Sequence, residues 1–232
     1  MQLIKMRDRM NFFTNAWDSD LAWSFRQAPL VMVAALMTTV IVLAAVLAPL
    51  IAPHDPFNPA TLNLMDGFTP PMTPNAMSGQ VYLLGTDNQG RDILSTILYG
   101  ARISLFVGFS AVLFAMVLGI FVGLVSAWRG GWIDSTLMRV ADIQLSFPSI
   151  LIALLIFGVA RSLIPVAYRE QMAIWVLIVA IGLSDWVQFA RVVRGAALVE
   201  KSKEYVQAAQ AIGVRPSRIV LTHILPNVMG PV

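Results

Sequence analysis

The sequence predicts an all-α protein, a polytopic bundle of membrane helices, and three observations support this. Of the 232 residues, 57% are hydrophobic, and the mean hydropathy is +0.72. Only 12% are charged, which is roughly half of the share that is usual in soluble domains. Uncharged apolar runs of bilayer-spanning length recur along the chain. A soluble protein of this size could not keep so much apolar surface from water, so we expect an integral membrane protein.

The first apolar run is Leu30–Ile51, which contains no charged residue. At about 1.5 Å per residue it crosses a hydrocarbon core of about 30 Å. It exceeds the roughly 7–15 apolar residues of a signal peptide, and the polar segment 1–29 precedes it, so we predict a membrane anchor. Three further spans are expected, at Ile103–Trp128, Ile143–Ile164 and Met172–Ala190.

The distribution of Lys and Arg predicts the direction of these spans. Residues 1–29 carry four such cations, residues 129–139 two, and residues 191–218 six. The segments on the other side, 52–102 and 161–169, carry two each. Cytoplasmic loops are enriched in Lys and Arg, so the N-terminal segment 1–29 is predicted to be cytoplasmic and 52–102 external.

The external segment 52–102 holds six of the thirteen prolines, which prevents it from being helical throughout. We expect an irregular loop that changes character at Arg91. From there Ile93, Leu94, Ile97 and Leu98 share one helical face, a pattern that favours a short helix in the membrane interface before the second span. Residues 103–232 then form the main membrane domain.

Catalytic and metal-binding patterns are absent from the sequence. It has no cysteine, its two histidines lie far apart, and it contains no phosphate-binding loop of the type GxxxxGK[ST]. We therefore expect no metal site, no cofactor and no enzyme activity in this chain. The basic residues sit in short loops beside apolar spans, which argues for a lipid bilayer as partner and against nucleic acid.

Two features within the spans have both a functional and a structural interpretation. Gly108, Gly119 and Gly123 share one face of the second span, which favours close helix packing, although glycine is common in membrane helices. Asp185 interrupts the fourth apolar run, and intramembrane carboxylates are often functional. It also lies six residues from Arg191, so the alternative is a carboxylate near the interface that is hydrogen-bonded to a neighbour or reaches toward the water.

The segment Glu204–Asn227 is too polar to span a bilayer. Glu204–Ile212 is predicted to be a short helix, and Gly213 to follow it in the left-handed conformation. Pro216 suits the first turn of a second helix, which Pro226 would end or bend near Leu225. Such a surface of small residues beside cations suits docking against another protein, and a helix lying on anionic lipid is the alternative.

This segment resembles the EAA loop of permease subunits of bacterial ABC importers, in which E-A-A is followed by a glycine and then I-x-L-P. The matching positions are Gln207, Ala208, Ala209, Gly213, Leu225 and Pro226. Gln207 replaces the family glutamate and His223 replaces its isoleucine.

A second stretch, Leu83–Gly108, is similar to a signature of the dipeptide/oligopeptide/nickel permease group, in particular its C-type subunit. The matching residues are Gly85, Thr86, Asp87, Gly90, Arg91, Asp92, Gly100, Ala101 and Arg102. We expect their role to be structural.

The resemblance implies the type I ABC importer permease fold, in the inner membrane of a bacterium. Members have six spans, and only four are visible here, so we expect the chain to be a fragment or truncated product. It also implies a related permease as heterodimer partner, an external solute-binding protein and two ATPase subunits, which would bind ATP and Mg²⁺.

The resemblance further implies that residues 204–227 couple the ATPases to the spans. Ala208, Ala209 and Gly213 would be contact and hinge positions, with Gln207, Arg215, Leu225 and Pro226 beside them. The expected cargo is di- or oligopeptides. Alternatives are nickel or another small solute, and a membrane accessory protein that transports nothing.

Overall fold

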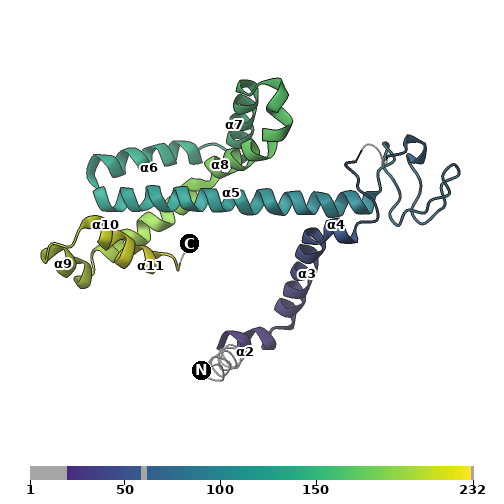
Figure 1. Cartoon of the computed structure of the whole chain (residues 1–232). Coiled ribbons are helices and arrows are strands. Elements are labelled where there is room, and N and C mark those ends of the chain that lie inside the picture. Colours follow the sequence, from purple (N-terminus) through teal and green to yellow (C-terminus); the bar gives the residue numbers. More distant parts are fainter. Residues whose placement is uncertain (1–19, 59–61, 231–232) are drawn as a thin grey trace, which may run out of the picture. The chain divides into compact units, whose positions relative to one another are not determined.

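The computed structural model describes residues 20–58 and 62–230, and its regular elements there are helices with two isolated β-bridges (Figure 1). The chain divides into two compact units, residues 1–105 and 106–232. Three helices in the described residues are long and apolar enough to cross a membrane, and a bent pair makes a fourth if it counts as one span.

The first apolar run forms α3 (Pro29–Val46), which follows α2 (Asp20–Gln27) and leads through a turn at Leu47 into α4 (Ala48–Ile51). Pro29 begins α3, where a missing N–H costs no helical bond. The hydroxyls of Thr38 and Thr39 donate to the carbonyls four residues earlier, both at 2.8 Å. Polar groups within this apolar helix are thus satisfied internally, as a hydrocarbon environment requires.

The segment between α4 and α5 is an irregular loop with one turn of 3-10 helix, η1 (Leu64–Asp66). Hydrogen bonds hold it together. The Tyr82 hydroxyl donates to the buried Asp66 carboxylate at 2.9 Å, and the Thr86 hydroxyl donates to the Asp66 carbonyl. Burial and the bond to Asp66 raise the pKa of Tyr82 to about 12.

One continuous helix, α5 (Ile93–Arg129), replaces the predicted pair of a short interfacial helix and a second span. Its 37 residues correspond to a length of roughly 55 Å. The expected break is absent because residues 93–102 contain no proline, and Gly100 alone does not end a helix. An amphipathic first part therefore continues directly into the apolar part.

The third predicted span, Ile143–Ile164, corresponds mainly to α7 (Ser149–Leu163). A further helix, α6 (Gly131–Leu145), precedes it, and the two helices are bent by 97° at the break between them. Gly130 and Gly131 have φ values of 63° and 55°, which make a tight turn after α5. Pro148 precedes α7 with an extended ψ of 130°, and proline disfavours a helical conformation in the residue before it. The sequence analysis did not predict α6, because its polar residues hid a helical period.

Helix α8 (Arg169–Lys201) follows a 3-10 turn, η2 (Val166–Tyr168), and extends the predicted fourth span at both ends. Buried Ala141 of α6 packs with Trp186, Val187 and Ala190 of α8, and with residues of α5. Gln144 strengthens this contact, since its amide donates to two α8 carbonyls at 2.9 Å and accepts from the Trp186 indole at 3.0 Å.

The chain then turns through α9 (Glu204–Ala211), α10 (Pro216–Ile219), a π-helical turn η3 (Val220–Ile224) and α11 (Leu225–Val228). The prediction that Pro226 ends or bends the helix near Leu225 needs correction. The helix widens one turn earlier, and Pro226 lies in the first turn of α11, where its missing N–H is tolerated.

Candidate functional site

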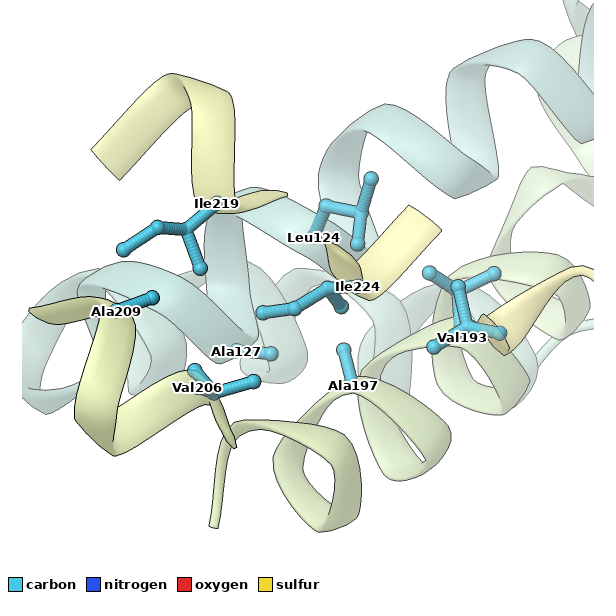
Figure 2. Packing of buried hydrophobic residues seen from close by; sticks show 9 residues of the cluster. Leu124, Ala127, Val193, Ala197, Val206, Ala209, Ile219 and Ile224 are labelled. Carbon is cyan, nitrogen blue, oxygen red and sulfur yellow. The ribbon is translucent and has the colours of Figure 1, made fainter. Parts of the chain in front are cut away.

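Helices α9 to α11 form an ordered structure because they pack on the ends of α5 and α8. Val206, Ile219 and Ile224 are almost fully buried. Figure 2 shows them pointing toward Ala127 of α5 and Ala197 of α8. The full cluster contains Leu124, Ala127, Val193, Ala197, Val206, Ala209, Ile219, Ile224 and Val228. Segment 204–228 is thus fixed to the two longest helices of the chain.

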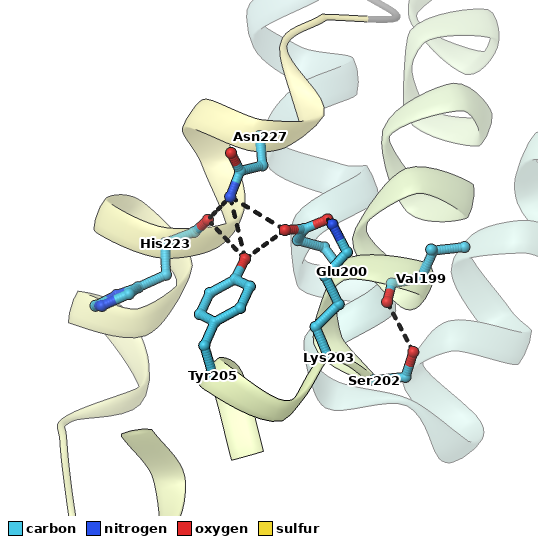
Figure 3. Close-up of polar contacts among 7 residues, drawn as sticks. All are labelled: Val199, Glu200, Ser202, Lys203, Tyr205, His223 and Asn227. Atoms are coloured by element: carbon cyan, nitrogen blue, oxygen red, sulfur yellow. Dashed lines mark hydrogen bonds and ion pairs between the residues drawn. The ribbon is translucent and has the colours of Figure 1, made fainter. Parts of the chain in front are cut away.

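A polar network lies beside this cluster and joins α8, α9 and α11 (Figure 3). The buried Glu200 carboxylate accepts from the Tyr205 hydroxyl and from the Asn227 amide, the latter at 3.1 Å, and it pairs with Lys203 at 2.7 Å. The Asn227 amide also donates to the His223 carbonyl at 2.8 Å. The hydrogen bond to Glu200 raises the pKa of Lys203, while burial and then the bond to Glu200 raise that of Tyr205.

Two further contacts join α8 to the region where α5 meets α6. The Lys201 ammonium donates to the Ala127 and Trp128 carbonyls at 3.1 and 2.8 Å, which satisfies the C-terminal end of α5. The Arg194 guanidinium binds both oxygens of Asp134 at 2.5 and 2.6 Å. These contacts fix α8 to the end of α5 and to α6.

The EAA-like residues divide between the two sides of α9. Ala208 and Gln207 are exposed, and the Gln207 amide donates to the Ser202 carbonyl at 3.0 Å. Ala209 is only 8% exposed and belongs to the apolar cluster, so it faces into the chain itself. Gly213 is exposed with a φ of +79°.

The exposed face continues beyond these residues. Arg215 and Pro226 are exposed, whereas Leu225 is half-buried and packs against the apolar cluster. Ile212, which the sequence analysis did not select, is 79% exposed. Its spacing of four from Ala208 places the two on one helical face, a signal already present in the sequence.

The residues of the signature before the second span form a tight turn and a helix cap. The Asp87 carboxylate accepts from the backbone of Gln89 and Arg91 at 2.8 and 2.9 Å and pairs with the Arg91 guanidinium. Burial raises the pKa of Asp87, but these hydrogen bonds and the Arg91 charge together lower it by more, so the pKa lies below its usual value. Asp92 accepts from the Ser95 backbone at 3.0 Å, in the first turn of α5.

Glycines of this signature occupy positions that a side chain could not. Gly85 and Gly90 have φ values of 77° and 74°. A Cβ on Gly85 would lie 2.5 Å from the Thr69 carbonyl oxygen, and one on Gly90 would collide with that of Asn63. Gly100 and Arg102, by contrast, lie within α5 and have no such constraint in the described structure.

The three glycines expected to pack against a helix have different surroundings. A Cβ on Gly119 would lie 2.6 Å from the Trp186 carbonyl oxygen of α8, and one on Gly123 at the same distance from that of Ala190. Nothing lies within 4 Å of the corresponding position at Gly108. Within the described residues, no group of three or more His, Cys, Asp or Glu side chains is placed to hold a metal ion.

Comparison with known proteins identifies the family. The family described as "Binding-protein-dependent transport system inner membrane component" matches residues 115–232, just over half of the chain. The chain belongs to this family. Residues 16–71 also match the family described as "N-terminal TM domain of oligopeptide transport permease C". The family is one of inner membrane components, and the described residues contain three candidate spans, or four if the bent pair is one span. Both findings agree with the prediction of a membrane protein.

Individual relatives support the same family. The chain is 34% identical to the oligopeptide transport system permease protein OppC of Bacillus subtilis, over 92% of this chain and 63% of the relative. It is 33% identical to the dipeptide transport system permease protein DppC of Haemophilus influenzae, over 89% of this chain and 65% of the relative. The chain therefore spans less than two thirds of the length of these permeases.

Proposed function

We propose that this chain is a permease subunit of an ATP-driven importer for di- or oligopeptides. Family membership supports a role in binding-protein-dependent transport, and the names of the relatives support peptides as cargo. In this proposal a solute-binding protein delivers the peptide outside, a related permease completes the pathway, and two ATPase subunits bind ATP and Mg²⁺. The chain itself conducts and couples without catalysis, within the six-span type I permease fold.

The proposed topology follows from the charge distribution. Residues 1–29 and 191–227 lie in the cytoplasm, residues 52–102 lie outside, and residues 30–51 and 103–232 provide the membrane spans. The family places the protein in an inner membrane, which agrees with this arrangement.

The exposed face of α9 carries the proposal for coupling. Gln207, Ala208 and Gly213 are exposed, together with Arg215, on a segment whose other side is held by buried apolar contacts. Small side chains allow a partner to approach closely, and a fixed base transmits its movement to α5 and α8. This surface would be supported by Ala209 and Leu225, which contact the apolar cluster, and by Pro226 at the start of α11.

A glutamate substitution at Ala208 tests the coupling proposal. Bulk in a packed interface costs about 1–3 kcal/mol, and an unpaired charge adds to this. At about 1.4 kcal/mol per tenfold, ATPase association should weaken by about 10-fold or more. Co-purification of the ATPase subunits with the complete permease pair, and hydrolysis stimulated by loaded binding protein, would measure it.

Two other variants control this experiment. Ala76→Glu makes the same change at an exposed position of the external loop and should leave ATPase association unchanged. Ala209→Glu should lower the stability of the chain itself, because it buries a charge in the apolar cluster. Normal co-purification and stimulation with Ala208→Glu would contradict the docking surface.

A further inference from the structure

The second unit contains a cavity lined by a carboxylate that has no partner among the residues that the structure describes. The cavity has a volume of about 380 Å³, and Asp185, Gln188 and Ser149 are its polar lining residues. Ala111, Val112, Ala115 and Phe189 complete the lining. Among the described residues, no hydrogen bond or ion pair reaches the Asp185 side chain.

The cavity lies at the middle of the two longest helices. Asp185 is 16 residues from each end of α8, and Ala111 is 18 residues from each end of α5. Asp185 is therefore about 24 Å along the helix from either terminus of α8, and it lies within the apolar run Met172–Ala190.

The nearest cations along α8 are already bound to other carboxylates. Arg191, the neighbour suggested by the sequence, pairs with Asp142 of α6, and Arg194 pairs with Asp134. No Lys, Arg or His lines the cavity. A carboxylate within a membrane span is costly unless a cation meets it, and the described residues that line this cavity supply none.

The chain breaks at the same cavity. Ser149 is the first residue of α7, directly after the 97° bend between α6 and α7. Discontinuous membrane helices line solute sites near the bilayer centre in transporters, because their free backbone groups then face a cavity and not lipid. The position of the break therefore independently favours a solute that enters here.

We infer that Asp185 binds the ammonium group of the transported solute, with Gln188 and Ser149 as neighbouring hydrogen-bonding groups. This inference rests on the proposed function, since a peptide with a free N-terminus carries an ammonium group at neutral pH. The carboxylate gives the cavity a preference for the amino end of the cargo. The exposed side chains of Val112 and Gln188 leave the cavity accessible.

The decisive experiment measures peptide binding to the complete transporter without its binding protein. The full-length permease pair with its ATPases is placed in nanodiscs, and tri-alanine and N-acetyl-tri-alanine are titrated by saturation-transfer NMR. The unmodified complex should bind the free-amine peptide about 10-fold or more tightly, the size expected from one charge-assisted hydrogen bond. Asp185→Asn, which keeps the side-chain size, should remove this preference, and Asp185→Glu should retain it.

Asp142→Asn is the matched control, because it removes an exposed carboxylate outside the cavity and should leave the preference unchanged. The inference is wrong if Asp185→Asn keeps the preference for the free amine, or if the unmodified complex has none. Loss of subunit co-purification with Asp185→Asn would show that a protein cation from a partner meets this carboxylate, and would also overturn it.

Uptake into proteoliposomes separates this inference from the proposed function. Asp185→Asn should lower the peptide transported per ATP hydrolysed by about 10-fold while stimulated hydrolysis stays unchanged, an effect that a purely structural role would not give. ATP-driven uptake by the unmodified complex with no amine preference would overturn the inference alone. Absence of any ATP-driven peptide uptake would overturn the proposed function.

Discussion

The irregular loop that precedes α5 and the helical segment 204–228 are ordered by different forces. Hydrogen bonds among Asp66, Thr69, Tyr82 and Thr86 hold the loop. Buried Val206, Ile219 and Ile224 hold the segment. Hydrogen bonds stabilise the loop only where its backbone and side chains fit closely together. The apolar contacts stabilise the segment from one side and leave the residues on its outer side unconstrained.

The glycines of the two regions show the same difference. Gly90 and Gly213 both have φ near +75°, at +74° and +79°. A Cβ on Gly90 would collide with the Asn63 carbonyl oxygen, whereas one on Gly213 would have nothing within 4 Å. The loop therefore requires glycine for space and conformation, and the segment requires it for conformation alone.

The largest effect is expected from alanine at Gly90. The collision with Asn63 adds to the left-handed strain, so Gly90→Ala should cost roughly 3–5 kcal/mol of stability. Gly213→Ala should cost only about 1 kcal/mol, since it adds strain without a collision. Urea unfolding in micelles, followed by protease cleavage within the loop for Gly90→Ala and within segment 204–228 for Gly213→Ala, would measure both. Equal costs at the two positions would contradict the distinction.

A smaller loss is expected in the apolar base of segment 204–228. Ile224 is 2% exposed, so Ile224→Ala should leave a cavity and lower the free energy of unfolding by about 2–4 kcal/mol. Leu221→Ala, at a side chain that is 60% exposed, provides the control and should cost well under 1 kcal/mol. The same unfolding assay would compare them. A similar loss for both variants would mean that the cluster does not support the segment.

The smallest effect is the response of the two regions to pH. The lowered pKa of Asp87 stabilises the loop above the pKa of the unfolded carboxyl, and this is lost as pH falls through the folded value. The raised pKa values of Tyr205 and Lys203 stabilise the segment below their unfolded values, and this is lost as pH rises through the folded ones. Acid should loosen the loop through Asp87, and also the segment, because Lys203 lowers the pKa of Glu200. Alkali should loosen the segment through Tyr205 and Lys203, and also the loop, because the pKa of Tyr82 is raised to about 12.

Spin labels can follow the two regions separately, because the chain has no native cysteine. Labels on cysteines introduced at Ala76 and Ala211, which are both exposed, would report local mobility. Asp87→Asn should abolish the acid response at Ala76, and Tyr205→Phe should reduce the alkaline response at Ala211. An unchanged acid response at Ala76 with Asp87→Asn, or an unchanged alkaline response at Ala211 with Tyr205→Phe, would contradict these assignments.

Sequence patterns predicted the elements that depend on composition or on local backbone chemistry. The apolar runs predicted α3 and the apolar parts of α5 and α8, and Gly213 was correctly assigned to the left-handed conformation after α9. Local rules suffice for these features, because a bilayer demands long apolar helices and a positive φ demands glycine.

Features that depend on tertiary contacts were missed. Helix α6 is stabilised by the fit of Ala141 and Gln144 against α8, which no helical pattern in its own sequence reveals. The inward orientation of Ala209 depends on which side of α9 meets α5, and alanine is acceptable on either side of a helix. The pairing of Arg191 with Asp142 was not predicted either, because the two residues are close in space and distant in sequence.

The π-helical turn Val220–Ile224 amounts to one extra residue inserted into an α-helix. The Leu225 N–H bonds the Val220 carbonyl across this widened turn. Deleting any one residue of the turn would restore the α-helical register and rotate everything after it by about 100°. Asn227 would then turn away from Glu200. The number of residues in this turn is therefore constrained as well as their type, and natural insertions and deletions should avoid it.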